Sequence, residues 1–180
     1  MAIKNFWSLN VDEAIIADKI GKEMGEEYQV FFPVNSQLKD IDLIIHNLKT
    51  GKSKSIQVKG SRTYDTKRTV VKEMGSAKTS WNVISGSSIF EPTNKIDFFI
   101  FVMHQEEYLK DKRKMIQNYV IIPITDFRKI TKNQKDSRKN GAFYHYSFAI
   151  KDQQLFECNN KKGKVIDFSK YLNNFDLLKF

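Results

Sequence analysis

The chain has one cysteine, three prolines and eight glycines among its 180 residues, and it contains no long uninterrupted apolar run. The single cysteine excludes an internal disulfide and cannot build a zinc cluster by itself. Because no apolar run approaches the thickness of a bilayer, we expect no membrane span. The first residues show no apolar stretch before a small-residue cleavage site, so no signal peptide is expected. These absences favour a water-soluble, cytoplasmic protein with no membrane partner.

The composition is that of a folded globule with an excess of positive charge. Hydrophobic residues make up 41% and aromatic residues 13%, which suits a single domain spanning 1–180. The net charge of +9 favours a polyanionic partner, with nucleic acid as the leading candidate. Basic residues concentrate in 59–78, 128–139 and 161–164. Each cluster taken alone is equally consistent with a solvated loop.

The first half of the chain predicts one helix and three strands. Asn10 is a suitable N-cap, and an apolar stripe at helical spacing predicts a helix over 11–24 that Gly25 closes. The run 28–34 predicts a buried strand. Strands over 42–47 and 55–60, joined by a Thr-Gly turn, predict a hairpin.

The second half predicts two strong strands among polar segments. Residues 63–94 are polar and predict irregular structure with a weakly marked helix over 76–84. Residues 95–104 are apolar on both faces, which is typical of a central strand. After a charged stretch, the sequence predicts a strand over 118–124, a short helix after Thr125, a strand over 143–150 and a C-terminal helix over 165–180. The pattern predicts an α/β fold with a central mixed sheet flanked by helices.

Four polar side chains are expected to converge at one end of this sheet. Side chains alternate along a strand, so Gln57 and Lys59 share a face. Asp42 heads the partner strand of the hairpin, close to the end of the returning strand. Glu13 lies on the apolar stripe of the first helix, which should face the sheet. Carboxylate and amide oxygens suit Mg²⁺, with water filling the remaining positions.

The spacing D-(x)14-QxK, with a glutamate on the preceding helix, resembles the PD-(D/E)xK nuclease superfamily over residues 13–104. The resemblance implies a restriction-endonuclease-like αβββαβ core over about 10–125, with 126–180 as a C-terminal strand and helix extension. It implies Mg²⁺, for which Mn²⁺ can substitute, bound by Asp42, Gln57 and Glu13. Lys59 would orient the attacking water or steady the charge that develops on the phosphate.

Nucleic-acid contacts are expected from the residues that follow the catalytic lysine. The basic stretch would grip phosphates and make binding dependent on salt. The candidates are Ser61, Arg62, Lys67, Arg68 and Lys78.

This sequence departs from the family pattern at three points. Ile41 stands where a proline is usual, Asp40 competes with Asp42 for the metal, and Gln57 is neutral where an acid is common. Each residue also has an ordinary interpretation: Glu13 as part of a capping box, Asp42 as a strand-start acid, and Lys59 as an exposed strand lysine.

The resulting hypothesis is a Mg²⁺-dependent DNA endonuclease of the restriction, repair or mobile-element type, acting as a homodimer on family grounds. One alternative is a nucleic-acid-binding module on the same fold with a degenerate site, which the neutral Gln57 supports. A third reading is a protein-interaction component whose basic surface meets an acidic partner.

Overall fold

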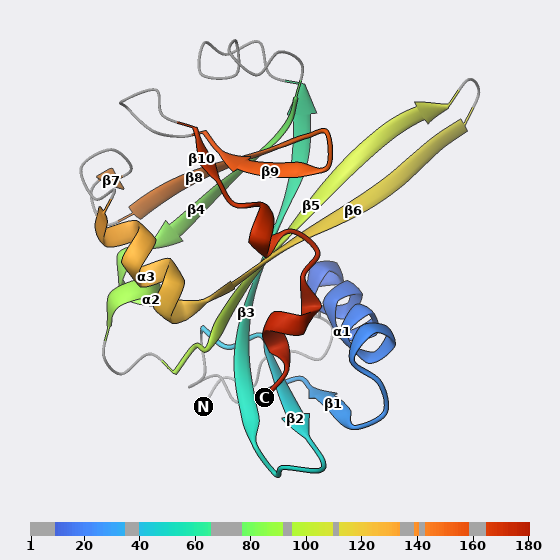
Figure 1. Ribbon diagram of the computed structural model, residues 1–180, viewed down its shortest axis with the longest axis vertical. Coiled ribbons are helices and arrows are strands. Elements are labelled where there is room, and N and C mark those ends of the chain that lie inside the picture. Colours follow the sequence, from blue (N-terminus) through green and yellow to red (C-terminus); the bar gives the residue numbers. More distant parts are fainter. Residues whose placement is uncertain are drawn as a thin grey trace.

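Two β-sheets share one long strand, β3 (Ser53–Asp65), which runs through the height of the molecule (Figure 1). The computed structural model describes residues 10–34, 40–65, 77–91, 95–109, 112–133, 139–140, 143–158 and 165–180. In these ranges the strands form one continuous ten-stranded arrangement. The lower part of β3 belongs to the first sheet and its upper end to the second, so both sheets are fixed relative to this strand.

The first sheet contains five strands in the order β1-β2-β3-β5-β6. Besides β3, its strands are β1 (Tyr28–Phe31), β2 (Leu43–Asn47), β5 (Phe98–Leu109) and β6 (Lys112–Pro123). A tight turn at Gly51, with φ of 67°, joins β2 to β3. The hairpin predicted from the Thr-Gly turn is therefore confirmed.

The second sheet continues from the upper end of β3 in the order β3-β4-β8-β9-β10, with β7 added beside β8. Its further strands are β4 (Lys78–Ser85), β7 (Lys139–Asn140), β8 (Phe143–Lys151), β9 (Gln154–Glu157) and β10 (Ile166–Asp167). Among the strand pairs of the described residues, only β3 and β5 run parallel.

The helices are few, and α1 (Val11–Met24) is the longest of those described. The Asn10 side chain accepts a hydrogen bond from the Asp12 N–H, and Gly25 ends the helix with φ of 78°, as its sequence predicts. The others are α2 (Gly86–Phe90), α3 (Ile124–Asn133) and the 3₁₀ turns η3 (Ser169–Tyr171) and η4 (Phe175–Leu178). No helix in the described ranges has both the length and the apolar character needed to cross a bilayer.

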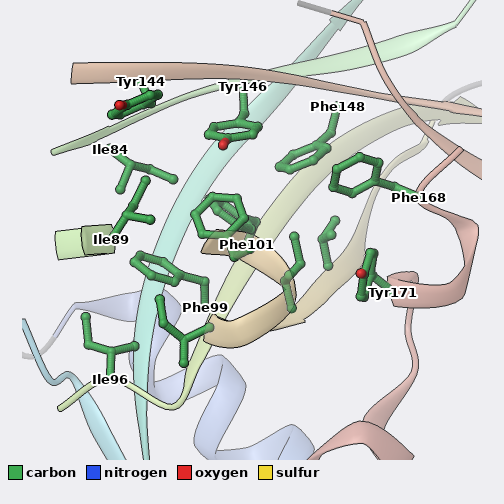
Figure 2. Packing of buried hydrophobic residues seen from close by; sticks show 14 of the residues in the cluster. Ile84, Ile89, Ile96, Phe99, Phe101, Tyr144, Tyr146, Phe148, Phe168 and Tyr171 are labelled. Carbon is green, nitrogen blue, oxygen red and sulfur yellow. The ribbon is translucent and has the colours of Figure 1, made fainter. Parts of the chain in front are cut away.

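Two hydrophobic clusters lie on opposite faces of β5. Ile100 and Val102 point toward α1, where they pack with Ile16 and Ile20. The alternate residues, led by Phe99 and Phe101, point between the two sheets. Figure 2 shows Tyr144, Tyr146 and Phe148 of β8 facing Phe99 and Phe101 across this space. The expectation that this strand is central and buried on both faces is confirmed.

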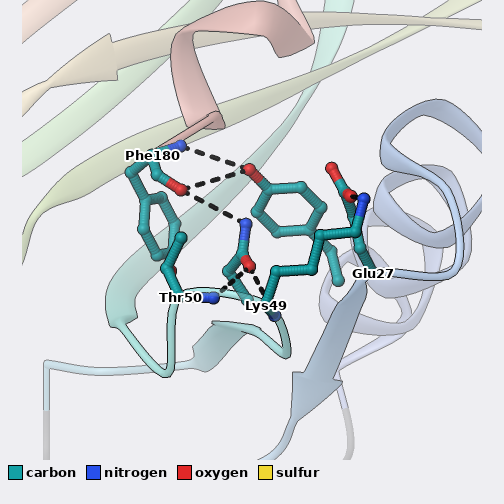
Figure 3. Close-up of polar contacts among 6 residues, drawn as sticks. Glu27, Lys49, Thr50 and Phe180 are labelled. Atoms are coloured by element: carbon teal, nitrogen blue, oxygen red, sulfur yellow. Dashed lines mark hydrogen bonds and ion pairs between the residues drawn. The ribbon is translucent and has the colours of Figure 1, made fainter.

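The C-terminal residue is held against the first two strands (Figure 3). The Phe180 carbonyl accepts hydrogen bonds from Asn47 Nδ2 at 3.2 Å and from the Tyr28 hydroxyl at 3.5 Å. A Glu27–Lys49 ion pair lies beside them. These contacts fix the β1–β2 end of the first sheet, at the far end of β2 from Asp42.

The expected fold class, a restriction-endonuclease-like αβββαβ core with a central mixed sheet flanked by helices, is wrong. The described chain is mostly antiparallel β-sheet, with only three α-helices in the described ranges. Residues expected to be irregular or helical extend β3 and form β4, and the charged stretch continues the β5–β6 hairpin. The predicted fold counted these residues as connections, so it omitted the second sheet.

Strand β4 was not predicted because its hydrophobic pattern is inverted: two polar residues are buried and the apolar residues between and after them are exposed. Ser80 and Asn82 are buried, at 1% and 5% exposure, and Asn82 Nδ2 donates to Ser80 Oγ at 3.2 Å. Trp81 and Val83 point outward, at 42% and 44% exposure. A strand whose buried face is partly polar gives no apolar alternation to detect, and the helix predicted over 76–84 is wrong.

Two other predicted elements are also corrected. The C-terminal helix over 165–180 is replaced by β10, η3 and η4, because Asn173 adopts a left-handed conformation with φ of 52° and interrupts the helical pattern. Phe168, Tyr171 and Phe175 are nevertheless buried. The strand predicted over 28–34 ends at Phe31, which is exposed rather than buried.

Candidate active site

Strand β3 changes partners at its middle, and the candidate residues lie at this change. The last β2 pair is Leu43–Ile56, and the first β4 pair is Thr63–Ser80. Between them, residues 57–62 pair with β5 but with no other described strand. We call residues 57–62 the β3 gap. Backbone groups on this side of β3 need partners other than a neighbouring strand.

Asp42 closes the lower side of the β3 gap. Its own N–H donates to the Ile56 carbonyl at 2.9 Å, and its Oδ2 accepts from the Val58 N–H at 2.7 Å. The carboxylate therefore supplies the hydrogen-bond acceptor that a neighbouring strand would otherwise provide for this amide of β3.

Gln57 lies beside Asp42 and is the most unusual polar side chain of the site. It is 4% exposed, and its Oε1 finds no hydrogen-bond partner in the described part of the chain. Asp42 lies outside the β2–β3 register, which begins at Leu43–Ile56, and it contacts the backbone of β3 at Ile56 and at Val58, on either side of Gln57. A buried amide oxygen without a partner costs about 1–3 kcal/mol.

Lys59 follows on the same face of β3, because side chains alternate along the strand. It pairs with Phe101 of β5 and is half-buried. The prediction that Gln57 and Lys59 share one face is therefore consistent with the register. Their ammonium and amide groups lie on the side of the first sheet opposite to α1.

Glu13 approaches from the other side of the sheet. It is 6% exposed and belongs to the buried stripe of α1, so its predicted orientation toward the sheet is confirmed. The first turn of α1 meets β3 at Gly60, where the Asp12 carboxylate occupies the space that a Cβ would need. Since β2 has ended at this level, the β3 gap is where groups from both faces of the sheet can approach. The meeting of Glu13 with Asp42 remains a prediction.

The competing acid, Asp40, contacts a different element. Ser88 Oγ of α2 donates to Asp40 Oδ1 at 3.3 Å. Asp42, by contrast, contacts the backbone of β3. Asp42 is thus the acid that lies directly against the Gln57–Lys59 strand.

The predicted phosphate contacts fall in different places. Ser61 lies in the β3 gap, where its Oγ donates to the Trp81 carbonyl at 3.1 Å, and Arg62 beside it is exposed. Lys78 lies at the far end of β4, where it pairs with Ile150 of β8, so it is not part of the gap. Lys67 and Arg68 lie outside the described residues.

Sequence reasoning missed a carboxylate–imidazole pair at the upper end of the β3 gap. Asp12 Oδ1 lies 2.5 Å from His104 Nε2, and both side chains are 18% exposed. The two residues are 92 positions apart, so no local pattern joins them. Gly60, immediately after Lys59, was the available signal, because a glycine inside a strand often marks close approach of another element.

The donor set is composed of oxygen. Within the described ranges, no group of three or more His, Cys, Asp or Glu residues could hold a metal ion. A cation at this site therefore depends on the Gln57 amide together with the carboxylates. Hard cations such as Mg²⁺ accept amide oxygens and usually retain several waters, so the donors fit such an ion.

Comparison of the chain with protein-family models, with curated proteins and with solved structures gives no match.

Proposed function

We propose that this chain is a Mg²⁺-dependent DNA endonuclease that hydrolyses phosphodiester bonds at the β3 gap. The observation that carries the proposal is the buried, unpartnered Oε1 of Gln57 beside the Asp42 carboxylate. The D-(x)14-QxK resemblance supports it as a likeness of motif. These side chains carry the proposal independently of the fold class.

An ion at this site would be held by Asp42, Gln57 and Glu13. Asp42 contacts the backbone of β3 on either side of Gln57, and Glu13 comes from the first turn of α1. Coordination would give the Gln57 oxygen the partner it lacks among the described residues. When bound, Mg²⁺ or Mn²⁺ polarises a phosphate oxygen and lowers the pKa of its water.

Lys59 supplies a positive charge two residues after the amide ligand. Its ammonium is a compact donor that can hold a phosphate oxygen or orient the attacking water. Phe101 of β5 lies beside it, which limits the access of bulk water on that side. A fixed charge in such a setting stabilises the developing negative charge better than one in open solvent.

DNA is the substrate that the charge favours. The net charge of +9 attracts polyanions, and the exposed Arg62 stands three residues from Lys59. The lone cysteine, which is buried, supports a reducing cytoplasmic setting. A homodimer would place two such sites on the two strands of a duplex.

The second candidate is a nucleic-acid-binding module with a degenerate site. The neutral amide of Gln57 favours it, because one negative charge fewer weakens the attraction for Mg²⁺. This candidate predicts salt-sensitive DNA binding without cleavage by any divalent ion. Calorimetric titration with Mg²⁺ separates the two, since a degenerate site gives no binding heat.

The test is cleavage of plasmid, single-stranded and branched DNA with Mg²⁺ and with Mn²⁺. Wild type, Lys59→Ala and Lys52→Ala should be compared, because Lys52 is an exposed lysine in the β2–β3 turn and its loss removes the same charge. We expect cleavage by wild type and Lys52→Ala only, with DNA binding retained by all three. Equal cleavage by Lys59→Ala would exclude the proposed mechanism.

A further inference from the structure

The outer surface of β4 and β8 is apolar where a solvent-facing sheet is usually polar. Trp81 and Val83 are 42% and 44% exposed, and Phe143 of β8 is 49% exposed. Val83 pairs with His145, so the outward side chains of the two strands share one surface. We call this surface the aromatic face: Trp81, Val83, Phe143 and His145. Exposed apolar patches of this kind mark interaction sites.

The inverted pattern of β4 shows that this surface is not a by-product of packing. Ser80 and Asn82 occupy the buried side, although Trp81 and Val83 next to them would bury more apolar area there. Exposing Trp81 and Val83 lowers the stability of the fold by the hydrophobic free energy that their burial would give. Local rules broken in this way are typical of functional surfaces.

The rings of the aromatic face are arranged to accept a planar partner. The Trp81 indole and His145 imidazole have centroids 5.3 Å apart with an interplanar angle of 48°. Tyr144 and Tyr146 alternate with Phe143 and His145 along β8 and point to the other side of the strand, where they are buried between the sheets (Figure 2). Their burial fixes the backbone beneath the exposed rings. Exposed aromatic rings on a β-sheet stack unpaired nucleobases in many single-strand-binding proteins.

The aromatic face is connected to the β3 gap. Ser61 Oγ donates to the Trp81 carbonyl at 3.1 Å and accepts from the Trp81 N–H at 3.4 Å. Ser61 is two residues from Lys59, a rise of about 7 Å along the strand. Arg62 is exposed at the same level and pairs with His104. Arg62 projects from the same face of the sheet as Trp81, whereas Lys59 projects from the face that looks between the two sheets. A strand whose phosphate contacts Arg62 would therefore bring a neighbouring nucleotide toward Trp81.

We propose that the aromatic face stacks an unpaired base of a DNA strand whose backbone contacts Arg62, so that the chain binds DNA with unpaired bases in preference to a fully paired duplex. The exposed Arg62 and the net charge of +9 favour a polyanionic occupant of this face. The inference builds on the proposed function, but base stacking needs neither metal nor cleavage.

The experiment measures binding without catalysis. Fluorescence anisotropy of a labelled oligothymidylate of about 15 nucleotides and of a duplex of equal length should be recorded in EDTA. We expect Trp81→Ala to weaken oligothymidylate binding by about tenfold, the loss of one stacked base, and Trp81→Phe to restore most of it. Duplex binding should change by less than about twofold.

A matched control is available on β1. Phe31 is 49% exposed, close to the 42% of Trp81. Like Trp81, it lies beside a histidine: the centroids of the Phe31 and His46 rings are 6.5 Å apart. Phe31→Ala should leave oligothymidylate binding unchanged. Equal losses for Phe31→Ala and Trp81→Ala, equal losses for duplex and single strand, or no binding of the oligothymidylate by wild type would each overturn the inference.

Two further outcomes separate this inference from the proposed nuclease. Selective loss of single-strand binding in Trp81→Ala, in a protein that cuts no DNA, supports the aromatic face and refutes the nuclease alone. Cleavage by wild type together with unchanged binding by Trp81→Ala refutes the aromatic face alone. A Trp81→Ala protein that changes from dimer to monomer in sedimentation and keeps full single-strand affinity identifies the face as a self-interface and overturns the inference.

Discussion

Replacing Gly60 with alanine tests how α1 is docked against the strand that carries Lys59. A Cβ on residue 60 would overlap the Asp12 carboxylate, with even the farther oxygen, Oδ1, only 2.9 Å away. The backbone of Gly60 has no positive φ, so the substitution causes no conformational strain of its own. Asp12 must move, and its bond to His104 is then lost.

The magnitude follows from that bond. A hydrogen bond to a charged group contributes about 1.5–3 kcal/mol, and Asp12 and His104 are mostly buried. Alanine recovers about 0.4–1 kcal/mol by restricting the unfolded chain. We therefore expect Gly60→Ala to lower the free energy of unfolding by about 1–2 kcal/mol. In a chain of this length, that lowers the melting temperature by roughly 2–8 °C.

A double-mutant cycle isolates the cause. Asp12→Ala removes both the bond and the obstructing carboxylate, so Gly60→Ala should stabilise the Asp12→Ala background by about 0.4–1 kcal/mol. Urea unfolding followed by circular dichroism gives the four free energies. A coupling of about 1.5–3 kcal/mol is expected, which is the contribution of the lost bond; effects that add to within about 0.5 kcal/mol would refute the proposed contact.

Three further predictions concern single groups. Gln57→Glu buries a charge, so its melting temperature should fall in EDTA and recover in Mg²⁺ by more than that of wild type; an equal response to Mg²⁺ in both proteins argues against a metal at this residue. Burial raises the pKa of Cys158 to about 11, so its native thiol should alkylate slowly at pH 8 and stability should fall between about pH 9 and 11; fast labelling of the folded protein contradicts this. The Tyr171 hydroxyl and then Lys170 lower the pKa of Asp126, so Asp126→Asn should lose stability at neutral pH and approach wild type as the pH falls through the folded pKa of this acid; a deficit that persists in acid would be due to packing.

The elements that the sequence predicted correctly are those with an unambiguous period. α1 combines a cap, an apolar stripe and a closing glycine, and β5 is apolar on both faces because clusters cover both. The hairpin also placed Asp42 against β3, where it contacts the Val58 N–H, while the convergence of its carboxylate with the Gln57 amide stays a prediction. Local patterns therefore sufficed for this part of the site.

The remaining features depended on contacts between distant residues. β4 buries Ser80 and Asn82, so its polarity resembled that of a loop, and without β4 the second sheet could not be predicted. The Asp12–His104 pair joins a helix to a strand 92 residues away. In the sequence, Asp12 is an ordinary acid in the first turn of a helix, and His104 is an ordinary residue at the end of an apolar run. Only the folded chain shows that the two side chains meet.

The central claim is that a divalent cation binds at the β3 gap through Asp42 and Gln57. Anomalous X-ray diffraction from crystals soaked in Mn²⁺ tests it directly, since it locates the ion without requiring activity. The account predicts one anomalous peak within coordination distance of the Asp42 carboxylate and Gln57 Oε1, absent from Asp42→Asn crystals. A peak at another position, or none at a Mn²⁺ concentration that supports cleavage, would contradict it.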